Sequence, residues 1–194
     1  MAVDTKQTKS IGEHFVCAML ARHDWAPALT RDGLARIDIL AVQTRGDRQM
    51  IEVQVKSIRG DQPKSSWPLG PSAQSLAVSD REWFVFVAIP HVSDLPMRSF
   101  VVPRDHVVAA AWIAHMHWLT EEGVPAGTRN TGIDRARVSL TALEGYENQW
   151  STLLSPATDA PVRLPSAYRE YALGRRVGLP SDHPWRITMP HWVP

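Results

Sequence analysis

Residues 82–89, with the sequence EWFVFVAI, limit the possible folds of this chain more than any other segment. Apart from the leading glutamate the run is apolar, and it is rich in aromatic and β-branched residues. A continuous apolar run of this length is typical of a strand that is buried on both faces. Because successive side chains of a strand point to opposite faces, such a strand needs a covering layer on each side.

The other expected elements complete an α/β arrangement. Apolar residues at helical spacing predict a helix from Ser10 to about His23, ending before Pro27. Residues 34–43 and 49–57 have the pattern of strands and flank a turn at 45–47, which predicts a hairpin. Further along we expect a strand at 98–102, a helix over 104–119, a short strand near 137–141, and helices around 146–154 and 166–177. This order predicts one mixed central sheet flanked by helices.

The length of 194 residues suits one domain with an extension. Residues 1–9 are expected to form a flexible N-terminal arm, and residues 10–155 the domain. Residues 156–194 carry seven of the 15 prolines, so we expect a helical, Pro/Trp-rich extension without long helices or central strands.

Several classes of protein are disfavoured by composition. The single cysteine, Cys17, excludes an internal disulfide and any multi-cysteine metal site. No apolar run is long enough to span a membrane, and the polar N-terminus lacks the apolar core of a signal peptide, so we expect a cytoplasmic protein. Glycine-rich phosphate-loop motifs are missing, which predicts no nucleotide cofactor. The net charge of +1 neither favours nor excludes nucleic acid, since only a binding cleft has to be positive.

Residues 51–57, with the sequence IEVQVKS, place chemistry on a predicted strand. Alternation puts Glu52, Gln54 and Lys56 on one face and three apolar residues on the other. On the preceding strand Asp38 stands between two isoleucines, where a carboxylate lies either at a strand end or in a site.

These residues resemble the motif of the PD-(D/E)XK nucleases, the restriction-endonuclease-like superfamily. The matching positions are Gly12-Glu13, Asp38 and Gln54-Val55-Lys56, and the VQVKS string looks like a branch of small prokaryotic nucleases with Gln in the place of the acid. The resemblance covers residues 10–155 and implies a restriction-endonuclease-like core. It further implies a Mg²⁺-dependent (Mn²⁺ as substitute) endonuclease that hydrolyses DNA, and a homodimer.

The resemblance also implies a role for each site residue. Asp38 is the metal ligand, Gln54 supplies a neutral oxygen, the Val55 carbonyl is a further ligand, and Lys56 orients water or offsets developing charge. Gln54 replaces the usual acid, which removes one negative charge from the ligand set. Glu13 is the first candidate to supply the missing acid, and Glu52 is the second. One or two carboxylates suffice for Mg²⁺, because this ion keeps several waters and binds substrate phosphate.

Each of these residues also has a structural interpretation. Ser10 and Glu13 fit a helix capping box, S-x-x-E. Asp38 fits an ion pair with Arg36, and Gln54 with Lys56 fits the solvated face of an edge strand. Trp67 fits either base stacking or the edge of a core. The C-terminal arginines fit either a DNA-backbone patch or a solvated helix: Arg163, Arg169, Arg175, Arg176 and Arg186.

Two rival functions follow from these interpretations. The first is a catalytically decayed nuclease fold that binds DNA or a protein partner, with Gln54 as the mark of the decay. The second is a structural or assembly subunit whose resemblance to nucleases is accidental and whose Trp-rich tail is its interface.

Overall fold

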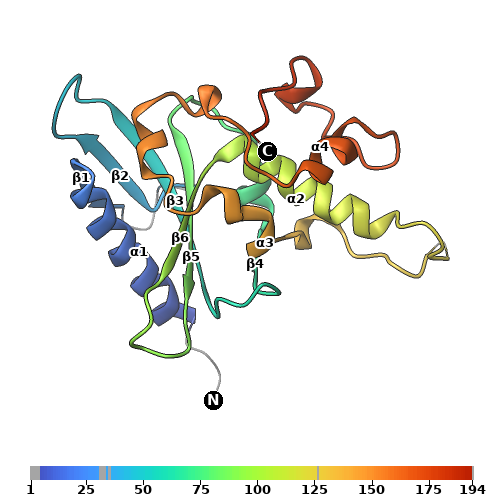
Figure 1. The fold of residues 1–194 in the computed structure, drawn as a ribbon, viewed down its shortest axis with the longest axis horizontal. Coiled ribbons are helices and arrows are strands. Elements are labelled where there is room, and N and C mark those ends of the chain that lie inside the picture. Colours follow the sequence, from blue (N-terminus) through green and yellow to red (C-terminus); the bar gives the residue numbers. More distant parts are fainter. Residues whose placement is uncertain (1–4, 31–33, 35, 126, 194) are drawn as a thin grey trace.

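A computed structural model describes residues 5–30, 34, 36–125 and 127–193 of the chain, and it confirms an α/β fold with a mixed, five-stranded central sheet (Figure 1). Strand β3 runs parallel to β5, and the other neighbours in the sheet are antiparallel. In spatial order the strands are β1 (Trp25–Leu29), β2 (Ile39–Gln43), β3 (Met50–Arg59), β5 (Glu82–Ile89) and β6 (Arg98–Pro103). The remaining helices and strands are α1 (Thr5–Arg22), α2 (Arg104–Leu119), α3 (Leu140–Leu143), α4 (Ser166–Leu173), and a small second sheet of β4 (Ser66–Pro68) and β7 (Arg137–Ser139).

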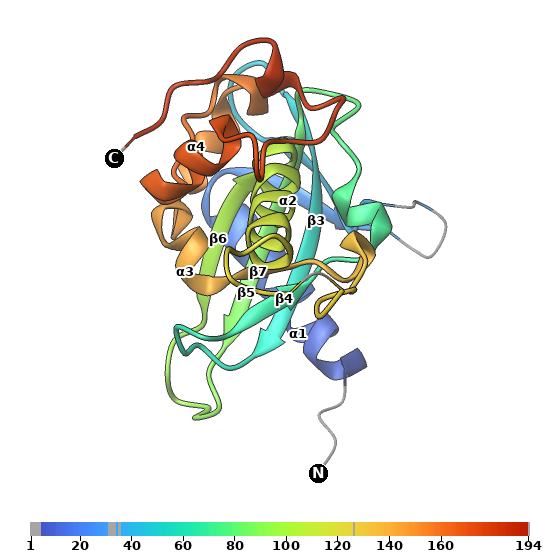
Figure 2. The same cartoon turned by 90° about the vertical axis from the view of Figure 1, so that its right-hand side faces the viewer.

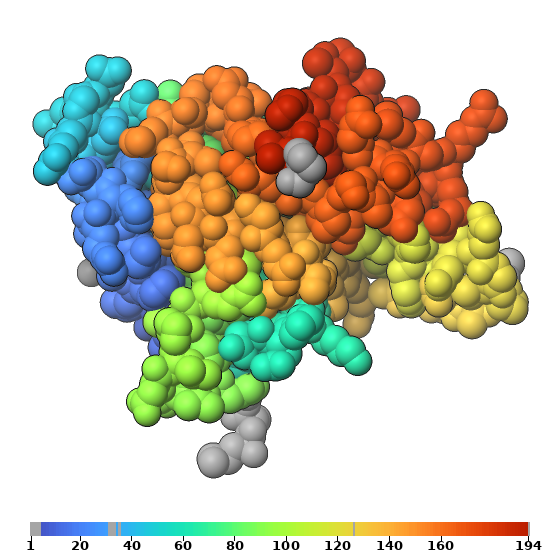
Figure 3. All heavy atoms as spheres, in the orientation of Figure 1, coloured from blue at the N-terminus to red at the C-terminus, as the bar shows by residue number. Residues whose placement is uncertain are grey.

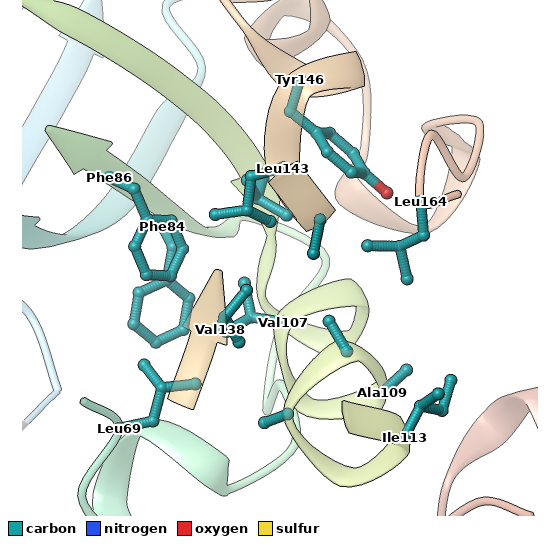
Figure 4. Packing of buried hydrophobic residues seen from close by; sticks show 14 of the residues in the cluster. Leu69, Phe84, Phe86, Val107, Ala109, Ile113, Val138, Leu143, Tyr146 and Leu164 are labelled. Atoms are coloured by element: carbon teal, nitrogen blue, oxygen red, sulfur yellow. The ribbon is translucent and has the colours of Figure 1, made fainter. Parts of the chain in front are cut away.

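The fully buried strand β5 divides the core into two parts, as its sequence predicts. Its odd-numbered residues, Trp83 to Val87, pack with Val16 and Leu20 of α1. Its even-numbered residues, Phe84 to Ala88, belong to a larger cluster with α2, α3 and β7. Figure 2 shows α2 in front of the sheet and α1 behind it, and Figure 4 shows Phe84 and Phe86 facing Val107 and Val138 in the larger cluster.

Helix α1 begins at Thr5, five residues before the predicted start at Ser10. Residues 5–9 are therefore part of the helix and not of a flexible arm, whereas residues 1–4 lie outside the described residues. Because Ser10 lies inside the helix, the capping-box interpretation of Ser10 and Glu13 is wrong. The buried positions of α1 are four residues apart: Thr8, Gly12, Val16 and Leu20.

Gly12 allows α1 to lie directly against β3. A Cβ atom at this position would stand 1.7 Å from Ser57 Oγ and 2.9 Å from Ser57 Cβ, and 3.5 Å from a Val55 methyl. No side chain fits in that space, so Gly12 is the position where the helix comes closest to the strand. The close approach brings the N-terminal half of α1 to the edge of β3.

The strands before β3 differ from the sequence-based expectation. The edge strand β1 was not predicted, since Pro27 lies in its middle; an edge strand tolerates proline because one side needs no partner. Strand β2 is shorter than the predicted 34–43 and begins only at Ile39, so Asp38 precedes it. The hairpin of β2 and β3 is present as predicted.

Residues 156–193, most of the expected C-terminal extension, contribute to the core of the fold. Val162, Val177, Leu179 and Trp185 belong to the same buried cluster as β5 and α2. Figure 3 shows the orange and red segments that follow β7 covering much of the molecule in this view. Around residues 146–154, where we expected a helix, the chain forms 3₁₀ turns.

Among the described residues, no helix combines the length and the apolar character that crossing a membrane would require.

His106 lies at the junction of α2 and the extension. Its ring is buried, with Nδ1 2.9 Å from Tyr146 Oη, and its edge contacts Trp185. The Arg163 main-chain N–H donates to the same Tyr146 oxygen, which leaves the phenol proton for His106 Nδ1. Burial, with a smaller contribution from His183, lowers the pKa of His106 to about 3.

We expect Gly12→Ala to lower the free energy of unfolding by about 2 kcal/mol, because the added methyl group overlaps Ser57. Urea denaturation measures the change. Gly70→Ala is the matched control, since its Cβ would meet nothing within 4 Å and Gly70 has an ordinary φ of −71°. Equal denaturation midpoints for the two variants would contradict this account of the α1–β3 contact.

The free energy of unfolding should fall as the pH drops from about 6.5 toward 4. Over this range the unfolded chain binds a proton at His106, whereas the folded chain keeps the imidazole neutral. His106→Gln keeps a hydrogen-bonding group but does not titrate, so its loss between pH 6.5 and 5 should be about 2 kcal/mol smaller. Urea titrations at the two pH values give the difference. Parallel pH profiles for both proteins would contradict the prediction.

Candidate active site

The candidate site lies where β2 and β3 separate. Pairing between the two strands ends at Ile39 and Val53, but β3 continues to Arg59. Beyond this point the edge of β3 has no β2 partner, and the Val55 N–H donates to Asp38 Oδ2 at 2.8 Å. The Asp38 main-chain N–H in turn donates to the Val53 carbonyl. The Asp38 side chain therefore accepts the hydrogen bond that a further residue of β2 would have accepted in the ladder. Its other carboxylate oxygen faces α1.

Helix α1 brings a second carboxylate to Asp38. Lys9 Nζ lies 3.3 Å from Glu13 Oε1 and 3.4 Å from Asp38 Oδ1, so one ammonium contacts both acids. Burial raises the pKa of Glu13, the nearby Asp38 raises it further, and Lys9 acts in the opposite direction. A cation that contacts both carboxylates therefore stabilises the charged form of Glu13 beside Asp38. The pair Glu13–Asp38, both predicted as site residues, is brought together by the fold.

Lys56 lies on β3 one residue after Val55. Burial lowers the pKa of its ammonium; Asp38 opposes the shift, while Lys9 and Arg104 add to it. Lys56 is half-buried and does not form an ion pair within 4 Å in the part of the chain described here. Its proton is therefore held less tightly than that of an exposed lysine, and its charge is close enough to interact with Asp38.

Gln54 is held by a residue that the sequence analysis missed. Arg104 Nη2 donates to Gln54 Oε1 at 2.9 Å, and both side chains are buried. A guanidinium has only donors, so the amide oxygen is the atom that faces Arg104. Arg104 uses one lone pair of this oxygen and puts a positive charge beside it, so the arrangement disfavours the predicted role of Gln54 as a side-chain metal ligand.

Arg104 belongs to a buried network of charged side chains that holds Gln54 in place. Its Nε lies 2.6 Å from Glu82 Oε2, and Arg36 Nη2 contacts the same oxygen at 2.9 Å. The Arg104 guanidinium also packs over the Phe84 ring, 4.5 Å from its centre. The ion-pair partner of Arg36 is thus Glu82, so the predicted ion pair of Asp38 with Arg36 is wrong. The other structural interpretation stands, because Asp38 lies directly before β2, at the strand end. The sequence holds one signal for this network, the position of Arg104 in the first turn of α2. A positive charge there is disfavoured by the helix dipole, so a carboxylate from another element is expected to neutralise it.

Among the described residues, Glu52, Arg176 and Arg186 form no ion pair with Glu13, Asp38 or Lys56. Glu52 stands in register with Leu40 and Glu82, before the point where β2 and β3 separate. In the extension, Arg176 donates to the Thr120 carbonyl and Arg186 to the Leu179 carbonyl, so both have structural contacts. Trp67, with 1% exposure, lies in the core against Phe86 and Phe100, which agrees with its structural interpretation.

The donor set fits a hard divalent cation in part. Glu13 and Asp38 are convergent carboxylates, and the Val55 carbonyl faces the same open edge because the N–H and C=O of one strand residue point the same way. The described residues contain no group of three or more His, Cys, Asp or Glu side chains arranged to hold a metal. Mg²⁺ needs no such group, since it is commonly held by one or two carboxylates with waters and phosphate.

Comparisons with known proteins add no relative: no family model, no curated protein and no solved structure matches this chain.

Arg104→Met should lower the free energy of unfolding by about 3 kcal/mol, because it leaves Glu82 buried beside a single arginine and frees Gln54. Urea denaturation of the variant measures the loss. The control is Arg98→Met, which removes a more exposed bidentate pair with Glu147 and should cost about 1 kcal/mol or less. A smaller loss for Arg104→Met than for the control would show that the network does not stabilise the fold.

Proposed function

We propose that this chain is a metal-dependent nuclease of the PD-(D/E)XK type that hydrolyses phosphodiester bonds of DNA. The observation that carries the proposal is the pair Glu13–Asp38 beside Lys56 at the open edge of β3. Residues from a helix, a strand entry and a strand meet there, although they are far apart in sequence. The mixed sheet with helices on both faces is compatible with a restriction-endonuclease-like core.

The proposed roles follow from the contacts of each residue. Glu13 and Asp38 would hold the metal, together with the Val55 carbonyl, and the Val55 N–H fixes the direction of the Asp38 carboxylate. A bound divalent ion supplies Lewis-acid activation of the phosphate and of water. Lys56 would orient that water through its ammonium, or accept a proton from it as the neutral amine, a form that burial favours by lowering its pKa. Gln54, held by Arg104, supports the position of the strand rather than ligating the ion.

Asp38→Asn and Lys56→Met should each reduce cleavage about 100-fold or more, because the first removes a ligand charge and the second a polar group at the reacting atoms. Asparagine still accepts the Val55 hydrogen bond, so the fold is retained. Purified proteins are incubated with Mg²⁺ or Mn²⁺ and linear, supercoiled, branched or single-stranded DNA, or RNA. Asp94→Asn, an exposed loop acid, is the matched control and should cut like the wild type.

Metal-dependent cutting by the wild type that persists in both site variants would overturn the residue assignment. Cutting of RNA alone would overturn the substrate class and leave the site intact.

The arrangement of Gln54 favours one alternative, a decayed nuclease fold that binds DNA or a protein. With the amide oxygen bonded to Arg104, two carboxylates face two lysines, so the site carries no excess negative charge. A decayed site would show no Asp38-dependent binding of Mn²⁺ and no cutting by the wild type.

A further inference from the structure

We propose that Lys9 is a built-in competitor of the metal: its ammonium neutralises Glu13 and Asp38 in the metal-free protein and leaves them when a divalent cation binds. This inference rests on the proposed function, because it concerns the same two carboxylates. It assigns a role to a residue outside the motif, in a segment that the sequence analysis treated as an arm.

Lys9 contacts the oxygens that a metal would need. Its Nζ lies within 3.4 Å of one oxygen from each acid, and no other lysine or arginine of the described residues forms an ion pair with either. The acids are largely buried, with 17% of each side chain exposed, so their charges require a nearby cation. An ammonium and a divalent ion compete for the same oxygens, because each neutralises the same pair of charges.

The contacts of Lys9 are easily broken. Its side chain is 61% exposed, and its four-carbon stem allows the ammonium to move into solvent without moving the helix. Within α1 the lysine precedes the glutamate by four residues, the weaker of the two orientations for a helical pair. An ion pair with one exposed partner is weak compared with the binding of a divalent ion by two carboxylates, so a metal can replace both pairs, although together they still oppose its binding.

The geometry therefore predicts that removal of the Lys9 charge tightens metal binding. Lys9→Met keeps the stem and the helix propensity, and its affinity for Mn²⁺ should rise about tenfold. Lys9→Arg keeps the competing charge and should bind Mn²⁺ like the wild type. Binding is measured by isothermal titration calorimetry with MnCl₂ and the full chain, without DNA. Lys64→Met, an exposed lysine in the loop after β3, controls for the lost unit of net charge and should leave the affinity unchanged.

A second measurement does not depend on binding heat. Without Lys9 the two acids lack their cation, so the metal-free Tm of Lys9→Met should fall below that of the wild type. Mn²⁺ should then raise the Tm of this variant by more than it raises that of the wild type.

Each outcome has a definite meaning. Equal or weaker Mn²⁺ affinity of Lys9→Met, with binding still lost in Asp38→Asn, overturns the competition and leaves the proposed metal site standing. The same tightening in Lys64→Met would show a general charge effect and also overturn it. If the wild type and Lys9→Met both fail to bind Mn²⁺, the proposed metal site and this inference fall together.

Discussion

The Val55 N–H lies on an edge of β3 that β2 has already left, and the carboxylate of Asp38 accepts its hydrogen bond. A strand edge with unpaired main-chain groups would otherwise have to be solvated or covered. Here a side chain completes the ladder, and the same carboxylate is thereby held with its second oxygen toward α1. The separation of β2 from β3 thus creates both the opening and the fixed carboxylate on which the candidate site depends.

The charges around this opening are balanced in pairs. Glu13 and Asp38 face Lys9, while Arg104 is balanced by Glu82 deep under the site. Lys56 stands between these two groups, close to Asp38 but without an ion pair of its own among the described residues. On the same face of β3, Gln54 lies between Lys56 and Glu52, and the Gln54 amide is held by Arg104. A glutamine at this position is compatible with a buried arginine beside it, since its neutral amide accepts one hydrogen bond without adding a charge.

Much of the sheet was predictable because its signals are local. The apolar run of β5, the alternation of β3 and the turn between β2 and β3 each follow from side-chain type and spacing over a few residues. Strand β1 was missed, because Pro27 reads as a breaker unless the strand is known to lie at an edge. The start of α1 was also missed: its first turns are polar, and Ser10 with Glu13 imitates a helix cap.

An α/β fold follows from the sequence, because the periodicity of apolar residues is a property of short segments. Alternation drew attention to Lys56, and the resemblance to a nuclease motif added Glu13 and Asp38 as site candidates. Two contacts could not be read from the sequence: the bridge that Lys9 forms between the two acids, and the hydrogen bond that Arg104 donates to the oxygen of Gln54. These contacts join residues that are up to 50 positions apart. They depend on how closely α1 approaches β3 at Gly12 and on where the pairing of β2 with β3 ends. Both features are set by the packing of whole elements against one another, which no short segment of sequence specifies.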